Sequence, residues 1–291
     1  MKTKVLEHYL QYSQFTYPGL YEDHLKSLPD NVKELGLLLR KQLIHRATLE
    51  KGKVGFDATQ KDVKSIPWFR QDEDDNFNTA AAIIAELFRR DSRGISEDRK
   101  AENKLILTCR HTTLLVASAL KAKGIPCRIR SGYAPYFPDE GDLSSDHWIN
   151  EYWNKKEQRW VILDVDGSGH NTGLDMFDLP KNAFDYPAKA WLDVRAGKID
   201  GDHFWNAKPA TGLKVVGWAL FYDLHCLMND EIQYIHNPAY LYFKWDSLDK
   251  KDLEELDELA KIMLNPDDNF DKLVSIWETN RNFRILKGGL L

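Results

Sequence analysis

The sequence predicts an α+β protein, in which a central helix packs on a small antiparallel sheet and further helices come from both ends of the chain. An apolar segment with helical start and stop signals runs from Cys109 to Gly124. Three runs rich in β-forming residues follow it, at 126–133, 146–153 and 159–165. Apolar residues at helical spacing dominate nearer the two ends of the chain. Together these patterns favour the α+β class.

Composition and charge exclude several classes of protein. The 291 residues are 43% hydrophobic and 29% charged, which is ordinary for a soluble globular protein. The net charge of −5 argues against a nucleic-acid partner, because phosphate binding requires a basic face. No apolar run reaches about 18 residues, and the segment Met1–Tyr9 lacks a signal-peptide core. We therefore expect a cytoplasmic protein with no membrane partner.

The cysteines argue against disulfides and structural zinc. Three cysteines, Cys109, Cys127 and Cys226, are too few and too scattered for a disulfide framework. No CxxC pair is present, so a structural zinc site is not expected. We expect neither a metal nor a cofactor. Cys127 and Cys226 lie in apolar segments and are interpreted as small buried hydrophobic residues.

Helical spacing organises the N-terminal part. Asp30 can cap a helix whose apolar residues include Val32, Leu35, Leu38, Leu39 and Ile44. A polar connection from Lys51 to Asn78 follows, and a second helix covers about 79–90. The segment Pro67-Trp68-Phe69 in this connection either anchors the loop or folds back onto a cleft.

The central helix begins at Cys109. Thr108 is the predicted N-cap, Gly124 the stop, and Pro126 lies just beyond. Its residues are apolar nearly all round, which is typical of a buried helix. A buried helix holds its N-terminus rigidly, and its first N–H groups can bind a developing negative charge.

The last two strand-like runs predict a hairpin, because only the polar segment NKKEQ separates them. His147 opens the first run. In the second, Asp164 shares a face with Trp160 and Ile162, where an apolar residue would be expected.

Beyond Asp166 the sequence predicts helices and no regular strands. Helices are expected at 186–197 and 213–228, after a cap at Ser247, and around Phe270–Trp277. We expect one domain over 1–291, divided into a helical part at 1–95, a core at 96–185 and a helical part at 186–291.

Position singles out Cys109, His147 and Asp164. A thiol at a helix N-terminus, facing a histidine and an aspartate on neighbouring strands, is a common way to make a nucleophilic thiolate. The plainer alternatives are a buried structural thiol, a surface histidine and a turn-forming aspartate. The neighbouring Asp146 and Asp166 are interpreted as solvated turn residues.

A calcium loop is a rival interpretation of the segment that contains Asp164. DVDGSGHNTGLD resembles an EF-hand loop, with candidate ligand or turn positions at Asp164, Asp166, Ser168, Gly169 and Asp175. Position 12 is Asp175 where an EF-hand has a bidentate glutamate, and a strand precedes the loop. The pattern therefore disfavours calcium.

Two ordered motifs resemble a known family. CRHTTLLVASALKAKGIPCRIRSGY resembles the Cys-helix-strand unit of the transglutaminase-like superfamily, and DHWINEYWNKKEQRWVILDVD resembles the unit that follows it. The flanking segments YPGLY and ALFYDLHCLMNDE resemble those of bacterial transglutaminase-like proteins. The resemblance spans about 104–166. It implies a papain-like arrangement with Cys109 as nucleophile, His147 as general base and Asp164 as the orienting carboxylate. His111 departs from the pattern, because relatives often carry aspartate there; this puts substrate contacts in doubt rather than the triad.

The resemblance implies cysteine-dependent acyl transfer or amide hydrolysis through an acyl-thioester on Cys109. The implied partner is a protein, peptide or small amide substrate, and the sequence leaves the oligomeric state open. The Cys109 backbone N–H would bind the oxyanion with one further donor, for which Trp68, Trp148 and Asn103 are candidates. The alternative is a non-catalytic binding module that has kept this fold.

Overall fold

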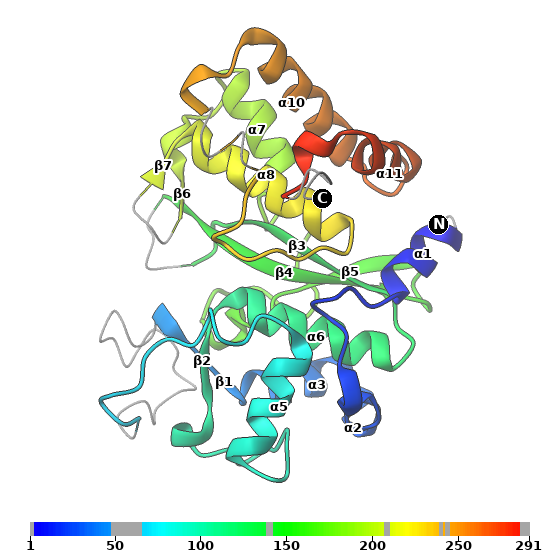
Figure 1. The fold of residues 1–291 in the computed structure, drawn as a ribbon, viewed down its shortest axis with the longest axis vertical. Coiled ribbons are helices and arrows are strands. Elements are labelled where there is room, and N and C mark those ends of the chain that lie inside the picture. Colours follow the sequence, from blue (N-terminus) through cyan, green and yellow to red (C-terminus); the bar gives the residue numbers. More distant parts are fainter. Residues whose placement is uncertain are drawn as a thin grey trace, which may run out of the picture. The chain divides into compact units, whose positions relative to one another are not determined.

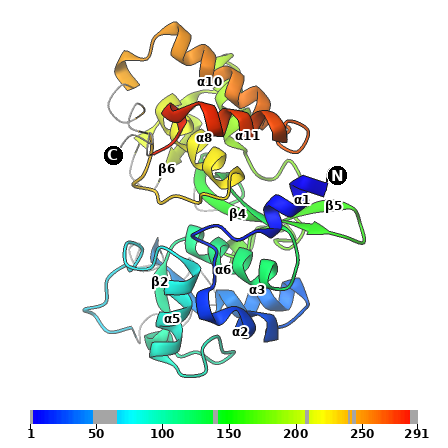
Figure 2. The ribbon, with the colours of Figure 1, turned by 45° about the vertical axis from the view of Figure 1, so that its right-hand side comes forward.

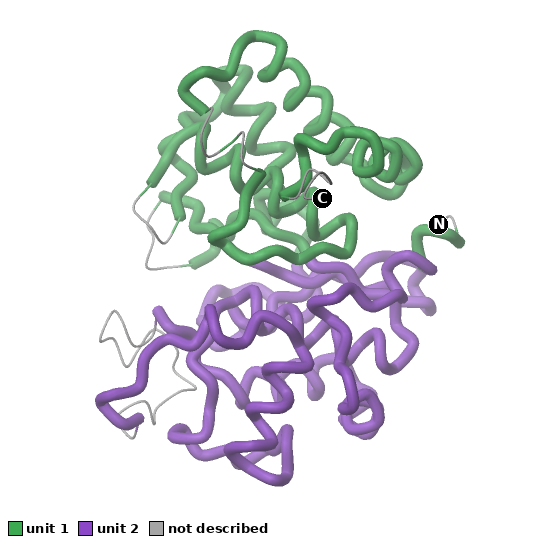
Figure 3. Tube along the Cα trace, in the orientation of Figure 1, with its two compact units in different colours: residues 1–6, 130–147, 180–291 green, residues 7–129, 148–179 purple. Residues whose placement is uncertain are grey.

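The computed structural model describes residues 3–47, 66–137, 142–206, 210–238, 241 and 245–285, and its α+β fold confirms the predicted class (Figure 1). The chain divides into two compact units, coloured separately in Figure 3. Unit 1 comprises 1–6, 130–147 and 180–291, and unit 2 comprises 7–129 and 148–179. The division falls inside two strands of the predicted core. The single-domain organisation stays a prediction, and most of the polar connection lies outside the described residues.

Unit 2 is built around helix α6 (Cys109–Ala122), which begins and ends where the sequence predicts. Three other helices pack against it: α2 (Glu22–Ser27), α3 (Val32–Arg40) and α5 (Ala80–Arg90). Figure 2 shows them gathered around α6. All 14 residues of α6 are buried. Gly124 follows the helix with φ +73°, the left-handed conformation expected of a glycine stop.

A short parallel pair of strands leads into α6. Strand β1 (Leu43–His45) pairs with β2 (Leu105–Leu107), with His45 opposite Leu107. The extension of the preceding helix to Ile44 was therefore wrong, because α3 ends at Arg40 and Ile44 lies in β1. Asn31, rather than Asp30, caps α3 with its side-chain oxygen. A strand of three residues is too short to show a period of two.

The predicted hairpin is present. Strand β4 (Ser144–Asn154) runs antiparallel to β5 (Arg159–Leu163), with Asn150 opposite Leu163. Gln158 has φ +52° in the connection, which lets the chain reverse within the four residues between the two strands. The preceding strand, β3 (Cys127–Ala134), also matches its predicted range closely.

The sheet contains more strands than the sequence predicts. Its order is β3-β4-β6-β7, with β5 pairing β4 off this path. Strand β6 (Phe204–Asn206) pairs in parallel with the start of β4, and β7 (Ala210–Thr211) pairs antiparallel with β6. The expectation of no strands after Asp166 was wrong. These strands are three and two residues long, so their pairing depends on partners distant in sequence.

Four predicted helices form the helical part of unit 1: α7 (Pro187–Arg195), α8 (Leu213–Leu227), α10 (Lys250–Met263) and α11 (Phe270–Thr279). The cap of α10 is Asp249 rather than Ser247. A buried ion pair joins α8 to β3: the Arg130 guanidinium donates to both carboxylate oxygens of Asp223, at 2.8 and 2.7 Å. Within the described ranges, no helix is both long enough and apolar enough to span a bilayer.

Candidate active site

Cys109 is the first residue of α6 and is 4% exposed. Thr108 is the N-cap, in extended conformation, and forms a capping box with His111. The box satisfies N–H groups that a helix start otherwise leaves without intrahelical partners. The thiol therefore sits at the positive end of a fixed helix, where a thiolate is favoured.

His111 has a structural role that the sequence did not reveal. Its Nδ1 lies 2.9 Å from Thr108 Oγ1 and accepts from the Thr108 backbone N–H at 3.4 Å. Its Nε2 lies 3.2 Å from the carbonyl oxygen of Asp74. The sequence contains one indication of this role, because His111 is the third residue of the helix. In a capping box this position usually holds Glu or Gln.

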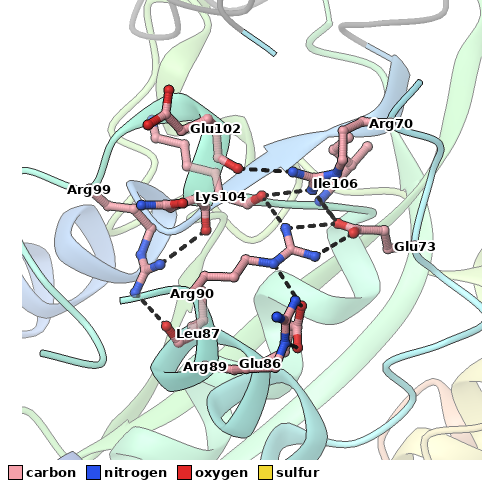
Figure 4. A network of polar contacts seen from close by, with 11 residues as sticks. Arg70, Glu73, Glu86, Leu87, Arg89, Arg90, Arg99, Glu102, Lys104 and Ile106 are labelled. Carbon is pink, nitrogen blue, oxygen red and sulfur yellow. Dashed lines mark hydrogen bonds and ion pairs between the residues drawn. The ribbon is translucent and has the colours of Figure 1, made fainter. Parts of the chain in front are cut away.

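The segment before α5 is held against the strand that leads to Cys109. Glu73 and Ile106 exchange two hydrogen bonds of 2.9 Å: the Glu73 N–H donates to the Ile106 carbonyl, and the Ile106 N–H donates to Glu73 Oε2. Arg70 and Arg90 both pair with the Glu73 carboxylate and donate to the Lys104 carbonyl (Figure 4). This network fixes the backbone at Glu73 beside β2.

Asp164 follows β5 directly and is 1% exposed. Its Oδ1 accepts the backbone N–H of Gly167 at 2.8 Å, and its own N–H donates to the Met176 carbonyl at 2.8 Å. A Cβ atom at Gly167 would overlap the Asp164 carboxylate. A buried carboxylate held by the chain on both sides is oriented before any substrate arrives.

Gly167→Ala is therefore expected to displace the Asp164 carboxylate and to lower turnover while Cys109 and its helix stay intact. Gly173→Ala is the matched control in the same loop, because nothing lies within 4 Å of a Cβ there, although its φ of +74° adds strain of its own. Kinetics and thermal melting of both variants check this expectation. Unchanged turnover in Gly167→Ala would show that the Asp164 position does not matter.

Asp166 contacts three other elements of unit 2, so the prediction of a solvated turn residue was wrong. Its Oδ1 accepts from the Thr112 hydroxyl in the first turn of α6 at 3.4 Å. Its carbonyl oxygen accepts from Arg40 Nε at 3.0 Å, and His45 Nε2 lies 3.7 Å from its Oδ2. The loop that carries Asp164 is thus attached to the turn that carries Cys109, within unit 2.

His147 lies in β4 and is buried. It is the last residue of its segment of unit 1, and the next residue, Trp148, belongs to unit 2. The Phe137 ring packs edge-on against the imidazole, with 4.9 Å between ring centroids. The grouping of His147 with Cys109 and Asp164 stays a prediction.

The candidate oxyanion donors differ in burial. Trp148 is fully buried on β4, whereas the Trp68 side chain is 93% exposed. Asn103 is half-buried in a short 3-10 helix just before β2. The neighbouring β4 residue Asn150 donates to the Thr113 carbonyl of α6 at 3.0 Å, so this stretch of β4 lies beside the first turns of the helix.

The loop after β5, which contains the EF-hand-like residues, makes local backbone contacts. The segment Gly167–Gly169 is a 3-10 turn, and Asp175 Oδ1 accepts the Phe177 N–H at 3.0 Å. Over the described part of the chain, no three His, Cys, Asp or Glu side chains are grouped as metal ligands. Cys127 and Cys226 are buried thiols in β3 and α8.

Comparison with known proteins gives a family match for the segment that contains the candidate site residues. Residues 73–165 match the model of the transglutaminase-like superfamily, which confirms the resemblance over this segment. The matched range contains Cys109, His147 and Asp164 as well as the Glu73 network. A search of curated proteins gave no match.

A solved structure that matches is the crystal structure of a candidate cysteine protease from Cytophaga hutchinsonii. The two sequences are 12% identical, and the match covers 64% of this chain and 46% of the other, with a TM-score of 0.38. The chain thus spans less than half the length of that protein.

Proposed function

We propose that this protein is a cysteine-dependent acyltransferase or amide hydrolase that uses Cys109, His147 and Asp164. The observation that carries the proposal is the position of Cys109 as first residue of a capped, wholly buried helix. A structural thiol has no need of that position, whereas a nucleophile gains both a favoured thiolate and rigid orientation from it.

The anchoring of Asp164 supports the same assignment. Its loop is attached through Asp166 to Thr112, one turn along the helix from Cys109. The carboxylate is buried, and a buried carboxylate is costly without partners. Such a group suits the orientation of an imidazole and the stabilisation of the imidazolium that forms during turnover.

Side-chain alternation supports the pairing of His147 with Asp164. Along β4, His147 projects from the same face of the strand as Ile149 and Glu151. Glu151 lies opposite Ile162 in the register with β5. Asp164 follows Ile162 by two residues, so alternation gives it that face too.

The proposed reaction has two halves. The Cys109 thiolate attacks the carbonyl carbon of an amide, and the oxyanion is bound by the Cys109 backbone N–H and one further donor. The C–N bond then breaks, and His147 gives its proton to the departing amine. Water or a second amine then attacks the resulting thioester, and His147 takes the proton of this nucleophile. The Cys109 thiolate leaves, and the product is a carboxylic acid or a new amide. The substrate is an amide in a protein, a peptide or a small molecule.

Selective alkylation tests the nucleophile. At about pH 6 an unperturbed cysteine is less than about 1% thiolate and reacts slowly with iodoacetamide. Brief treatment of the folded chain, followed by peptide mapping, should modify Cys109 almost alone. Cys127 and Cys226 are internal controls, since both are fully buried within a strand and a helix interior.

His147→Ala is expected to suppress this labelling, because it removes the imidazolium that stabilises the thiolate. Phe137→Leu is the matched control, since it removes the ring that packs on the imidazole and leaves the imidazole in place. Equal labelling of the three cysteines, or labelling only in denaturant, would favour the non-catalytic binding module.

A further inference from the structure

His111 links two elements that the proposed mechanism needs in fixed positions. A carbonyl oxygen only accepts hydrogen bonds, so Nε2 must donate to the Asp74 carbonyl, at 3.2 Å. The Thr108 backbone N–H only donates, so Nδ1 must accept. The two bonds together require a neutral ring with its proton on Nε2.

The charges around His111 favour this neutral form. Burial lowers the pKa of His111 well below its usual value, and Arg110, His45 and Arg46 act in the same direction. Asp74 Oδ1, 4.0 Å from Nδ1, would favour an imidazolium. That separation is too long for a hydrogen bond, and Nδ1 already accepts from the Thr108 N–H.

The partner of His111 is itself immobilised. Asp74 follows Glu73, whose backbone and carboxylate are bonded to Ile106. The Asp74 carboxylate accepts from Arg46 at 2.9 Å. The Asp74 carbonyl is therefore held independently of His111, by contacts to β2 and to Arg46.

We propose that His111 is a positioning residue, which as a neutral linker attaches the first turn of the Cys109 helix to Asp74 and makes the orientation of the thiol depend on segment 70–78. The kinetic part of this inference rests on the proposed nucleophile, whereas the tautomer of His111 does not. An aspartate at this position could cap the helix but could not donate to Asp74.

The tautomer can be measured in the full chain labelled with ¹⁵N-histidine. The His111 ring should give the neutral Nε2–H pattern at pH 7 and keep it below about pH 6.5, where an unperturbed histidine is half protonated. A folded-state pKa below the unfolded one means that the contribution of this contact to stability is present above about pH 6.5 and is lost as pH falls through the folded pKa. An imidazolium or an Nδ1–H tautomer at pH 7 would overturn the proposal.

Two substitutions separate positioning from bulk. In His111→Gln, the amide oxygen can accept from Thr108 and the amide nitrogen can donate to Asp74, so alkylation and turnover should stay close to those of the parent. In His111→Leu both bonds are lost. We expect both rates to fall by roughly 10- to 100-fold, because small misplacements of reacting groups cost up to about 100-fold. Ser118→Ala is the control in α6, since the Ser118 hydroxyl is buried and bonds to no other described residue.

A double-mutant cycle identifies the route of the effect. If His111 acts through segment 70–78, the losses in the rate of Cys109 alkylation caused by His111→Leu and Glu73→Gln should be less than additive. Additive losses would reduce His111 to a local helix cap, and a failure of His111→Gln to restore alkylation would contradict any role for the two His111 hydrogen bonds. If Cys109 is not the nucleophile, Cys109→Ala will spare turnover while the His111 tautomer stays as described, so the two failures are distinguishable.

Discussion

Cys109→Ala is expected to abolish turnover of any amide substrate while the melting temperature changes little. The substitution removes one sulfur atom at a helix end, and the Thr108–His111 capping box does not involve that side chain. The proposed chemistry has no substitute for the thiolate, because every later step of it proceeds through the thioester. Substrate-peptide profiling followed by steady-state kinetics and calorimetry measures both quantities.

Cys127→Ala and Cys226→Ala are the matched controls for this variant. Both thiols are buried away from helix starts. Their removal should therefore alter the free energy of unfolding and leave the turnover rate unchanged. If Cys109→Ala collapses the fold instead, the thiol is a packing residue and the enzyme assignment is wrong.

Asp164→Asn is expected to lower kcat on the order of 10⁴-fold, the scale found when a triad carboxylate becomes an amide. The asparagine oxygen can keep the bond to the Gly167 N–H, so the loop should stay folded. The amide nitrogen would then present a donor where the imidazole also donates, which enforces the wrong tautomer. Kinetics with purified protein and a thermal melt separate the two effects.

The control for Asp164→Asn is Asp175→Asn, an exposed carboxylate in the loop after β5. Its contact to the Phe177 N–H survives the change, since an amide oxygen also accepts. Near-normal activity of Asp164→Asn would remove this residue from the mechanism.

The sequence predicted those elements whose signals are local. The start and stop of α6 follow from Thr108 and Gly124, and the β4–β5 hairpin follows from two β-rich runs separated by five polar residues. Short strands such as β1 and β6 were missed, because their existence depends on distant partners rather than on a period.

The roles of residues that depend on tertiary contacts could not be predicted from the sequence either. Asp166 is a turn residue by its neighbours, yet Arg40, His45 and Thr112 converge on it from three elements. Gly167 has an unremarkable sequence context, and only the Asp164 carboxylate beneath it explains why a side chain would not fit. For His111 the capping position was visible, but the Asp74 carbonyl was not.

The burial of every residue of α6 has a consequence for hydrogen exchange. Amide protons in the interior of that helix have no exposed face through which local fraying could admit solvent, so their exchange requires a large opening of unit 2. The opening free energies calculated from the protection factors of these amides would then approach the free energy of unfolding of unit 2. The helix that carries Cys109, the proposed nucleophile, is thus also the natural reporter of how often its unit unfolds.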